Sequence, residues 1–181
     1  MRILQVFLAM LLGLFSQASL LAAIPACIPS GIQAWWSADG DAVDQVNGHS
    51  GALQGGVTFS PGKVGQAFNL DGSTGRVAIP NSPLWNFGSN DFTIDLWMNL
   101  NAAPSGGIGN PSPVFLSHDN GPTNVNKWVL SLGGGILNFQ VASPSLGPVV
   151  VVQAPFVPLI HQWYHLALTR SGTTERMPVS S

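Results

Sequence analysis

Residues 91–100 alternate between apolar and polar side chains with the two-residue period of a β-strand. The stretch reads Asp91-Phe92-Thr93-Ile94-Asp95-Leu96-Trp97-Met98-Asn99-Leu100. Because successive side chains of a strand point to opposite faces, the even-numbered residues share an apolar face and Thr93, Asp95 and Trp97 share the other. We therefore predict a strand with one face packed in a core.

Short apolar or alternating runs recur on both sides of this stretch, separated by clusters of Gly, Pro, Asn, Asp and Ser. From Ser30 onward no run has a helical period of useful length, so the pattern indicates an all-β sandwich or barrel. Residues 71–75 separate the runs 66–70 and 76–79, and we interpret them as a hairpin connection. The other runs are 32–36, 57–59, 114–117, 128–132, 136–141, 149–152 and 163–169.

The composition is that of one turn-rich domain with an apolar core. The chain has 181 residues, of which 8% are charged, and it contains 21 Gly, 14 Pro and 6 Trp. The formal net charge of −2 gives no field that would attract nucleic acid or anionic lipid. Nucleic-acid binding is therefore not expected.

The N-terminal residues have the pattern of a secretory leader. Arg2 supplies a positive charge, residues 3–14 are almost continuously apolar, and Ser16 and Ala18 are small. We predict a cleaved signal peptide over 1–23 and a short leader over 24–30, and hence a secreted or cell-surface protein. The alternative is a buried or membrane-spanning helix. Prolines follow almost at once, however, so no membrane span is expected after signal cleavage.

Cys27 is the only cysteine, so neither an intrachain disulfide nor a zinc site built from thiolates is possible. Three interpretations stay open. Residues 24–27 resemble a bacterial lipobox apart from Pro25; the thiol pairs with a second chain or with a cysteine lost from the C-terminus; or it is an inert free thiol.

Five blocks of the chain follow one another in the order of a family pattern. The second block contains Ser60-Pro61-Gly62-Lys63-Val64-Gly65-Gln66-Ala67-Phe68, and the last is Trp163-Tyr164-His165-Leu166-Ala167-Leu168-Thr169-Arg170. The others are 31–51, 76–80 and 91–98. Together they resemble laminin-G-like domains of the concanavalin A-like lectin/glucanase superfamily. The resemblance implies an all-β, antiparallel two-sheet jelly-roll sandwich over residues 31–170.

Residues 171–181 depart from the family pattern. In the family, the strand that ends near Arg170 is followed by a glycine-turn hairpin and at least one more core strand. Here the tail is polar and interrupted by Pro178, and we interpret it as non-alternating. We predict a divergent tail and a sandwich that lacks its last strands. Two explanations are open: a truncated or frameshifted gene product, or a fragment completed by another chain.

Catalysis is not expected, although the superfamily includes glucanases. A retaining pair of carboxylates lies about 5 Å apart, whereas Asp91 and Asp95, four residues apart in a strand, are separated by roughly 13 Å. Glu175, the only Glu, falls in the tail, and Asp119 stands alone. No Gly-x-Ser-x-Gly motif accompanies the histidines. We therefore predict that the chain is not an enzyme.

Calcium is the metal that the acidic residues favour, because Ca²⁺ takes carboxylate and carbonyl oxygens from glycine-rich turns. Asp44 lies in one such turn, together with Asp39, Asp41 and Asn47, and Asp71 opens another. The family resemblance implies a structural calcium ion, with Asp44 among its ligands. We predict Asp44 and Asp71 as metal ligands. The alternative is that both residues make Asx-turns.

Trp85 is the predicted ligand-binding residue, because sugars stack on exposed aromatic faces and residues 81–89 form a loop. Trp35 and Trp163 lie within the family strand motifs and are expected to pack inside the sandwich, whereas the burial of Trp97 stays open because its strand places it opposite the apolar face. The resemblance then implies a secreted, non-catalytic carbohydrate-binding or adhesion module whose partner is a glycan or an extracellular protein. The alternatives are a structural or protein-interaction domain without a glycan ligand, and a non-functional truncated fragment.

Overall fold

The computed structural model describes residues 30–104, 113–119, 125–143 and 147–181. The chain divides into residues 1–30 and 31–181, and all the described strands belong to the second unit. The predicted signal peptide (1–23), most of the leader and Cys27 lie outside the described residues.

The described chain consists of short β-strands and one turn of 3₁₀ helix, η1 (Pro83–Trp85). The strands are β1 (Ala52–Gln54), β2 (Thr58–Pro61), β3 (Gln66–Asn69), β4 (Arg76–Ala78), β5 (Phe92–Asn99), β6 (Val114–His118), β7 (Trp128–Gly133), β8 (Ile136–Ser143), β9 (Gly147–Pro155), β10 (Trp163–Ser171), β11 (Thr174–Arg176) and β12 (Val179–Ser180).

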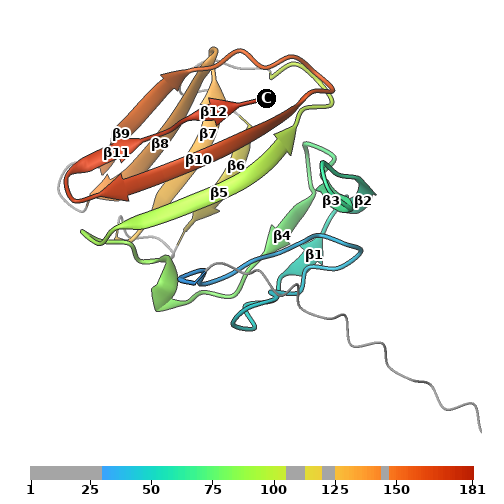
Figure 1. The fold of residues 1–181 in the computed structure, drawn as a ribbon, viewed down its shortest axis with the longest axis horizontal. Coiled ribbons are helices and arrows are strands. Elements are labelled where there is room, and N and C mark those ends of the chain that lie inside the picture. Colours follow the sequence, from blue (N-terminus) through green and yellow to red (C-terminus); the bar gives the residue numbers. More distant parts are fainter. Residues whose placement is uncertain (1–29, 105–112, 120–124, 144–146) are drawn as a thin grey trace, which may run out of the picture. The chain divides into compact units, whose positions relative to one another are not determined.

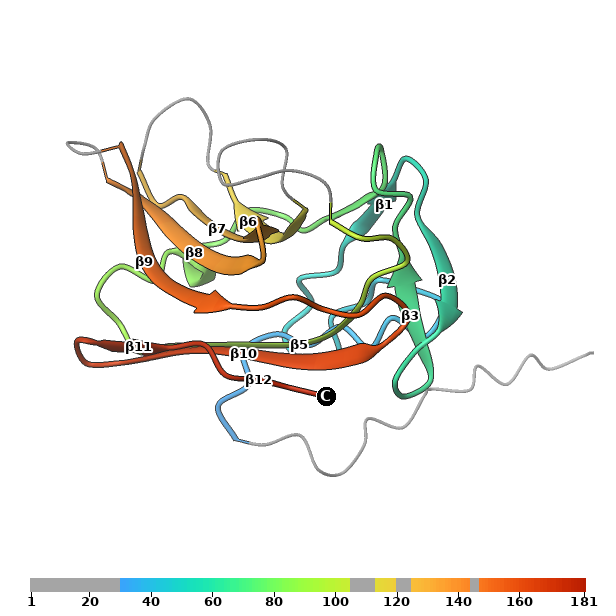
Figure 2. The same ribbon diagram turned by 90° about the horizontal axis from the view of Figure 1, so that it is seen from above.

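Two antiparallel sheets face each other and confirm the predicted all-β sandwich (Figures 1 and 2). One sheet has the order β6-β7-β8-β9. In the other, β10 lies between β5 on one side and the pair β11 and β12 on the other. The sheets meet through a core that each supplies in part: Leu130, Leu132, Leu137 and Phe139 from β7 and β8, and Met98, Leu166, Leu168 and Met177 from the opposite sheet.

The alternation of residues 91–100 is confirmed as strand β5. Its even-numbered side chains pack against the core, and Met98 is buried. The odd-numbered side chains point away from the facing sheet, which leaves Trp97 44% exposed. The burial of Trp97, which the sequence left open, is thereby decided in favour of exposure. The strand period that places Phe92 and Met98 inside also places Trp97 outside.

The structure differs from the predicted tail. Residues 174–180 form β11 and β12, which both pair with β10 in one continuous register, from Ser171↔Thr174 to His165↔Ser180. Their side chains alternate between inward and outward, with Met177 buried in the core and Val179 packed against it. The tail is therefore the second strand of a hairpin with β10, interrupted at Met177 and Pro178.

Two features of the tail made its alternation hard to recognise from the sequence. Glu175 is a charged residue at an inward position, where it lies directly across from Arg170 and forms an ion pair with it. Pro178 occupies an edge strand, where its carbonyl still accepts a hydrogen bond from the Ala167 N–H at 3.2 Å although it has no N–H to return. The prediction that further strands are missing is a separate one and stays a prediction.

The hairpin predicted around residues 71–75 is wrong. β3 pairs with β2 and β4 pairs with β1, so the segment joins strands that do not pair with each other. The Asp71 carboxylate turns the chain instead, by accepting backbone N–H groups from Ser73, Thr74 and Gly75. A side chain that caps the backbone in this way replaces the strand ladder of a hairpin turn.

Candidate functional site

An exposed aromatic surface lies on the outer face of the β5–β10 pair. Trp97 is directly across from His165, and their ring centres are 5.0 Å apart. His165 Nε2 lies 2.8 Å from Asp95 Oδ1, and the Lys63 ammonium lies 4.8 Å from the centre of the Trp97 ring. We call Lys63, Asp95, Trp97 and His165 the Trp97 platform. The sequence reasoning missed it, although the alternation of β5 already contained the signal.

Trp85, the residue predicted to bind a ligand, is partly buried at the end of η1. Its ring lies 6.0 Å from that of Trp36 and 5.3 Å from that of His49. Its indole N–H donates to the Pro80 carbonyl at 3.1 Å, and its own carbonyl accepts the Trp128 indole N–H at 2.9 Å. These contacts join η1 to the N-terminal loop and to β7. Ligand binding by Trp85 stays a prediction.

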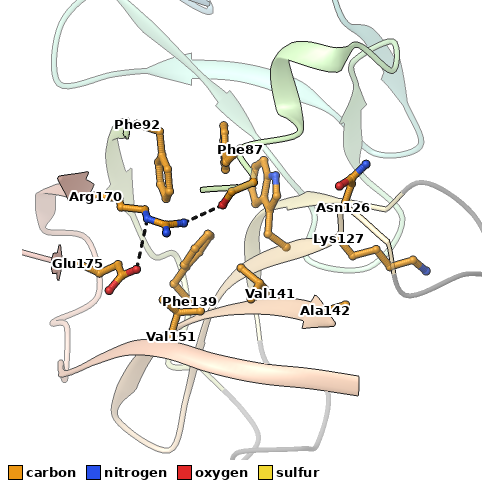
Figure 3. A pocket seen from close by; sticks show the side chains of 12 residues that line it. Phe87, Phe92, Asn126, Lys127, Phe139, Val141, Ala142, Val151, Arg170 and Glu175 are labelled. Atoms are coloured by element: carbon orange, nitrogen blue, oxygen red, sulfur yellow. Dashed lines mark hydrogen bonds and ion pairs between the residues drawn. The ribbon is translucent and has the colours of Figure 1, made fainter. Parts of the chain in front are cut away.

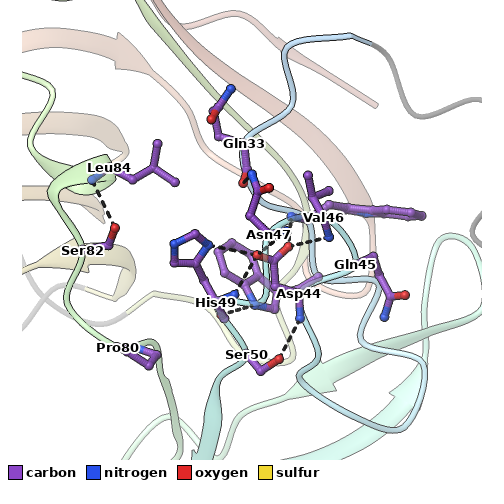
Figure 4. Close-up of polar contacts among 12 residues, drawn as sticks. Gln33, Asp44, Gln45, Val46, Asn47, His49, Ser50, Pro80, Ser82 and Leu84 are labelled. Atoms are coloured by element: carbon purple, nitrogen blue, oxygen red, sulfur yellow. Dashed lines mark hydrogen bonds and ion pairs between the residues drawn. The ribbon is translucent and has the colours of Figure 1, made fainter.

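Asp44 is buried at the centre of a hydrogen-bond network (Figure 4). Its carboxylate accepts the backbone N–H groups of Trp35, Val46, Asn47 and His49 at 2.9–3.2 Å, and His49 Nδ1 lies 3.1 Å from it. Burial alone raises the pKa of Asp44, but the hydrogen bonds from Trp35, His49 and Val46 outweigh it and lower the pKa to about 2.

Asp71 is the exposed counterpart of Asp44. The Thr74 hydroxyl donates to its carboxylate at 2.7 Å, and the amides of Ser73, Gly75 and Thr74 donate as well. These donors, the hydroxyl first, lower the pKa of Asp71 well below its ordinary value. Both predicted metal ligands therefore make Asx-turns, which is the alternative that the sequence left open.

These carboxylates are a poor fit for calcium as they stand. Each is surrounded by N–H and O–H donors, which use the lone pairs that Ca²⁺ needs. Asp39 and Asp41 are also occupied, by the amides of Gln66 and Val43. Within the described ranges, no group of three or more His, Cys, Asp or Glu residues could hold a metal ion. A calcium site at Asp44 and Asp71 stays a prediction, and the ion would have to displace these donors.

A cavity of about 360 Å³ opens between the two sheets, at the end of the sandwich near η1 (Figure 3). On one side, Phe92, Arg170 and Glu175 form a row across the β5, β10 and β11 strands. On the other side lie apolar residues of β7, β8 and β9, and Phe87 covers one end. The lining includes Phe87, Phe92, Trp128, Phe139, Val141 and Val151.

The charged groups of this cavity are already paired. The Arg170 guanidinium lies 3.7 Å from the Glu175 carboxylate and donates to the carbonyls of Gly88 and Gly172. Lys127, at the rim, lies 2.6 Å from Asp119. Sequence reasoning placed Glu175 in a tail outside the sandwich, and it could not foresee that the hairpin with β10 brings this side chain to the cavity.

The family model for the laminin-G type of the concanavalin A-like lectin/glucanases superfamily matches residues 71–179. The chain belongs to this superfamily. No curated protein and no solved structure matches it. The matched stretch includes both sheets of the sandwich and extends into β12, so it also contains the tail hairpin.

Laminin-G-like domains often bind carbohydrates or mediate adhesion, are typically extracellular and are generally non-catalytic. In this laminin-G-like domain, the carboxylates whose spacing was tested above against that of a glycosidase pair each contact another group. Asp95 contacts His165 on the outer face, Asp91 accepts the Gly172 N–H at 2.7 Å, and Glu175 pairs with Arg170. Across the described residues, no helix is long and apolar enough to cross a membrane.

Proposed function

We propose that this laminin-G-like domain is a secreted, non-catalytic carbohydrate-binding or adhesion module. The Trp97 platform supports the proposal most directly, because a pyranose stacks its apolar C–H face on an exposed aromatic ring and needs polar groups beside it. Trp97 supplies the ring, and its neighbours Asp95 and His165 offer hydrogen-bonding groups for sugar hydroxyls.

The platform is open to a ligand of this kind. The Asp95 side chain is 56% exposed and that of His165 is 32% exposed. Lys63 contacts the Trp97 ring through a cation–π interaction, which contributes about 0.5–1 kcal/mol at an exposed site. A stacked sugar can therefore displace the Lys63 ammonium at small cost and then accept a hydrogen bond from it.

Secretion and calcium are parts of the proposal that rest on the sequence. The leader over residues 1–23 supports export, and Asp44 and Asp71 are the carboxylates that would hold a structural calcium ion. Neither is needed for stacking at Trp97, which lies on a different part of the fold. Sugar binding and its calcium dependence can therefore be tested separately.

A glycan array tests the proposal, with wild type and Trp97→Ala each measured in Ca²⁺ and in EDTA. We expect saturable binding of at least one class of glycan to wild type and its loss in Trp97→Ala. Equal binding in EDTA would remove calcium from the proposal without affecting the platform. If wild type binds no glycan and instead captures a single extracellular protein, the domain is a protein-interaction module and the carbohydrate proposal is wrong.

Trp85 is the matched control, because it was the residue that the sequence predicted to bind the ligand. A Trp85→Phe variant keeps an aromatic ring beside Trp36 and His49. We expect it to bind the same glycans as wild type. Loss of binding in Trp85→Phe, with Trp97→Ala unaffected, would move the sugar site from the platform to η1.

A further inference from the structure

One side of β5 carries backbone groups that no described strand pairs with. The Ala167 N–H donates to the Pro178 carbonyl, so the odd-numbered residues of β10 bond to the tail. Because the bonding direction alternates along a strand, the even-numbered residues of β10 bond to β5, where they lie across from even-numbered residues. The N–H and C=O groups of Thr93, Asp95 and Trp97 therefore point to the other side of β5, which we call the free edge.

The apolar layer of the sandwich is incompletely covered beside this free edge. Leu166 and Leu168 of β10 are each 1% exposed. Leu96 and Ile94 lie directly across from them on the same inner face, but they are only partly buried. A further strand beside β5 would cover these two side chains and remove their apolar surface from water.

The other outer strands of the two sheets carry features that discourage pairing with a further strand. The register of β6 shifts between Val114 and Leu116, and β9 has a register shift of its own and ends at Pro155. In the tail, β12 has only two residues and follows Pro178. By contrast, β5 has eight residues in unbroken register with β10 and contains no proline. It is therefore the edge best suited to pair with another strand.

A single extended segment fits this edge better than the edge of a second sandwich does. On the side of β5 away from β10, Figure 1 shows strands β1–β4 of the same chain. They contact β5 near its C-terminal end, where Lys63 lies against the Trp97 ring and the Asn101 side chain donates to that of Asn69 at 3.1 Å. A second sandwich would have to bring its own β1–β4 into the same region, whereas an isolated strand has no such bulk.

The side chains of β5 determine which segment can pair with it. Ile94 and Leu96 require apolar side chains at alternate positions of the segment, on the inner face. The residue between these positions lies across from Asp95 on the outer face, where the Asp95 side chain is 56% exposed. A lysine or arginine at that position gains a cross-strand ion pair. Proline is excluded wherever the segment must donate to β5, because it has no N–H.

We propose that the free edge of β5 binds an extended segment of another protein, which adds a strand to the sheet of β5 and β10. The segment is apolar at alternate positions and carries a lysine or arginine across from Asp95. The backbone groups of Thr93, Asp95 and Trp97 bond to it, and its apolar side chains cover Ile94 and Leu96. This pairing uses the backbone of β5, so it does not rest on sugar binding by the Trp97 side chain.

Fluorescence anisotropy with three labelled peptides tests the mode of binding. The first peptide alternates, Lys-Val-Thr-Val-Lys-Val-Thr-Val-Lys. The second has the same composition without alternation, Lys-Lys-Val-Val-Thr-Thr-Val-Val-Lys, and the third is the alternating peptide with proline in place of both threonines. We expect saturable binding of the first and at least about tenfold weaker binding of the others, which lose apolar cover or hydrogen bonds. No saturable binding of the alternating peptide, or equal binding of all three, would overturn the proposal.

Amide hydrogen exchange measured by NMR places the peptide on the protein. With the alternating peptide at saturation, the amides of Thr93, Asp95 and Trp97 should exchange at least about tenfold more slowly, because they become hydrogen-bonded. The amides of β6 and β9 should exchange as in the free protein. Protection of β6 or β9 in place of β5 would show that the peptide pairs at another edge and that the proposal is wrong.

A proline variant removes one donor from the free edge. Thr93→Pro leaves the bonds between β5 and β10 in place, because the Thr93 N–H points away from β10. We expect it to bind the alternating peptide at least about tenfold more weakly. Thr93→Val keeps the N–H and should bind as wild type does. Unchanged binding in a folded Thr93→Pro would contradict pairing at this edge.

A charge exchange gives an independent measurement if Thr93→Pro does not fold. Asp95→Lys should bind the alternating peptide about two- to fivefold more weakly, because two lysines then lie across from each other. A peptide with glutamate in place of the central lysine should show the opposite preference, binding Asp95→Lys more tightly than wild type. If Asp95→Lys does not change the preference between these two peptides, the segment does not lie across from Asp95.

The occupant and the independence of the two sites are tested last. Under reducing conditions, in which Cys27 cannot link two chains, analytical ultracentrifugation should show a monomer. A dimer that Thr93→Pro abolishes would assign the free edge to a second copy and overturn the proposal of a separate partner. Trp97→Ala should bind the alternating peptide as wild type does, and Thr93→Pro should keep its glycan binding, so failure at one site leaves the other unaffected.

Discussion

Asp44 shows how one buried carboxylate organises a loop that has little regular structure. It gathers amides from Trp35 and from the turn Val46–His49, so segments on both sides of it are held together. Because these bonds favour the charged form, the pKa of Asp44 falls to about 2 in the folded chain. An unfolded aspartate has a pKa of about 3.9, so folding is linked to proton release at this residue.

This linkage gives a pH prediction. Since the folded pKa is lowered, the stabilisation is fully present above about pH 4 and is lost as the pH falls through about 2. The difference corresponds to about 2 kcal/mol in the free energy of unfolding. Urea unfolding at pH 5 and pH 2 should show a larger loss for wild type than for Asp44→Asn. Asp41→Asn, which alters an exposed carboxylate, should behave like wild type, and an equal loss in Asp44→Asn would contradict this role.

At the scale of the residue, the structure shows the turns and contacts that Asp44, Asp71 and Trp85 make, and their predicted roles in metal and ligand binding stay predictions. Asp44 and Asp71 were identified as carboxylates in glycine-rich turns, and both are indeed central to their turns. Whether such a carboxylate meets amide donors or a cation depends on which way the backbone groups point, and composition does not contain that information. Trp85 and Trp97 are a similar pair, because exposure depends on the packing of the strand or loop that carries each ring.

The hairpin formed by β10 and the tail is the element that differs most from its sequence prediction. Met177 is 8% exposed and packs in the core, between inward-facing Glu175 and Val179. We expect Met177→Ala to lower the free energy of unfolding by about 2–4 kcal/mol, because it removes buried apolar surface and leaves a cavity. Chemical denaturation measures this, and Ser180→Ala, an outward change on the same strand, should shift it by less than about 0.5 kcal/mol.

A Met177→Ala variant that is destabilised as little as Ser180→Ala would show that the tail does not pack against the core.

β5 was predictable because its alternation is local and uninterrupted. The tail was not, because its pattern contains a glutamate whose partner, Arg170, lies on the neighbouring strand. β3 and β4 were assigned to one hairpin for a related reason: the turn at Asp71 was visible in the sequence, but the partner of each strand was not.

At the scale of the whole molecule, the prediction of export rests on the sequence, because the leader lies outside the described residues. Expressed with its own leader, the chain should reach the outside of the membrane and lose about 23 residues, as a secretory signal does. Mass spectrometry of the exported protein gives the new N-terminus and also shows whether Cys27 carries a lipid. An uncleaved chain retained in the membrane fraction would contradict the predicted signal peptide.

A sugar stacked on Trp97 would lie on the outer face of one sheet, and calorimetry on the best glycan from the array tests this placement most directly. We predict that Trp97→Ala weakens its association constant by about tenfold or more, as expected for the loss of a central aromatic contact. Trp85→Phe should leave it unchanged. An unchanged constant in a folded Trp97→Ala would contradict the account.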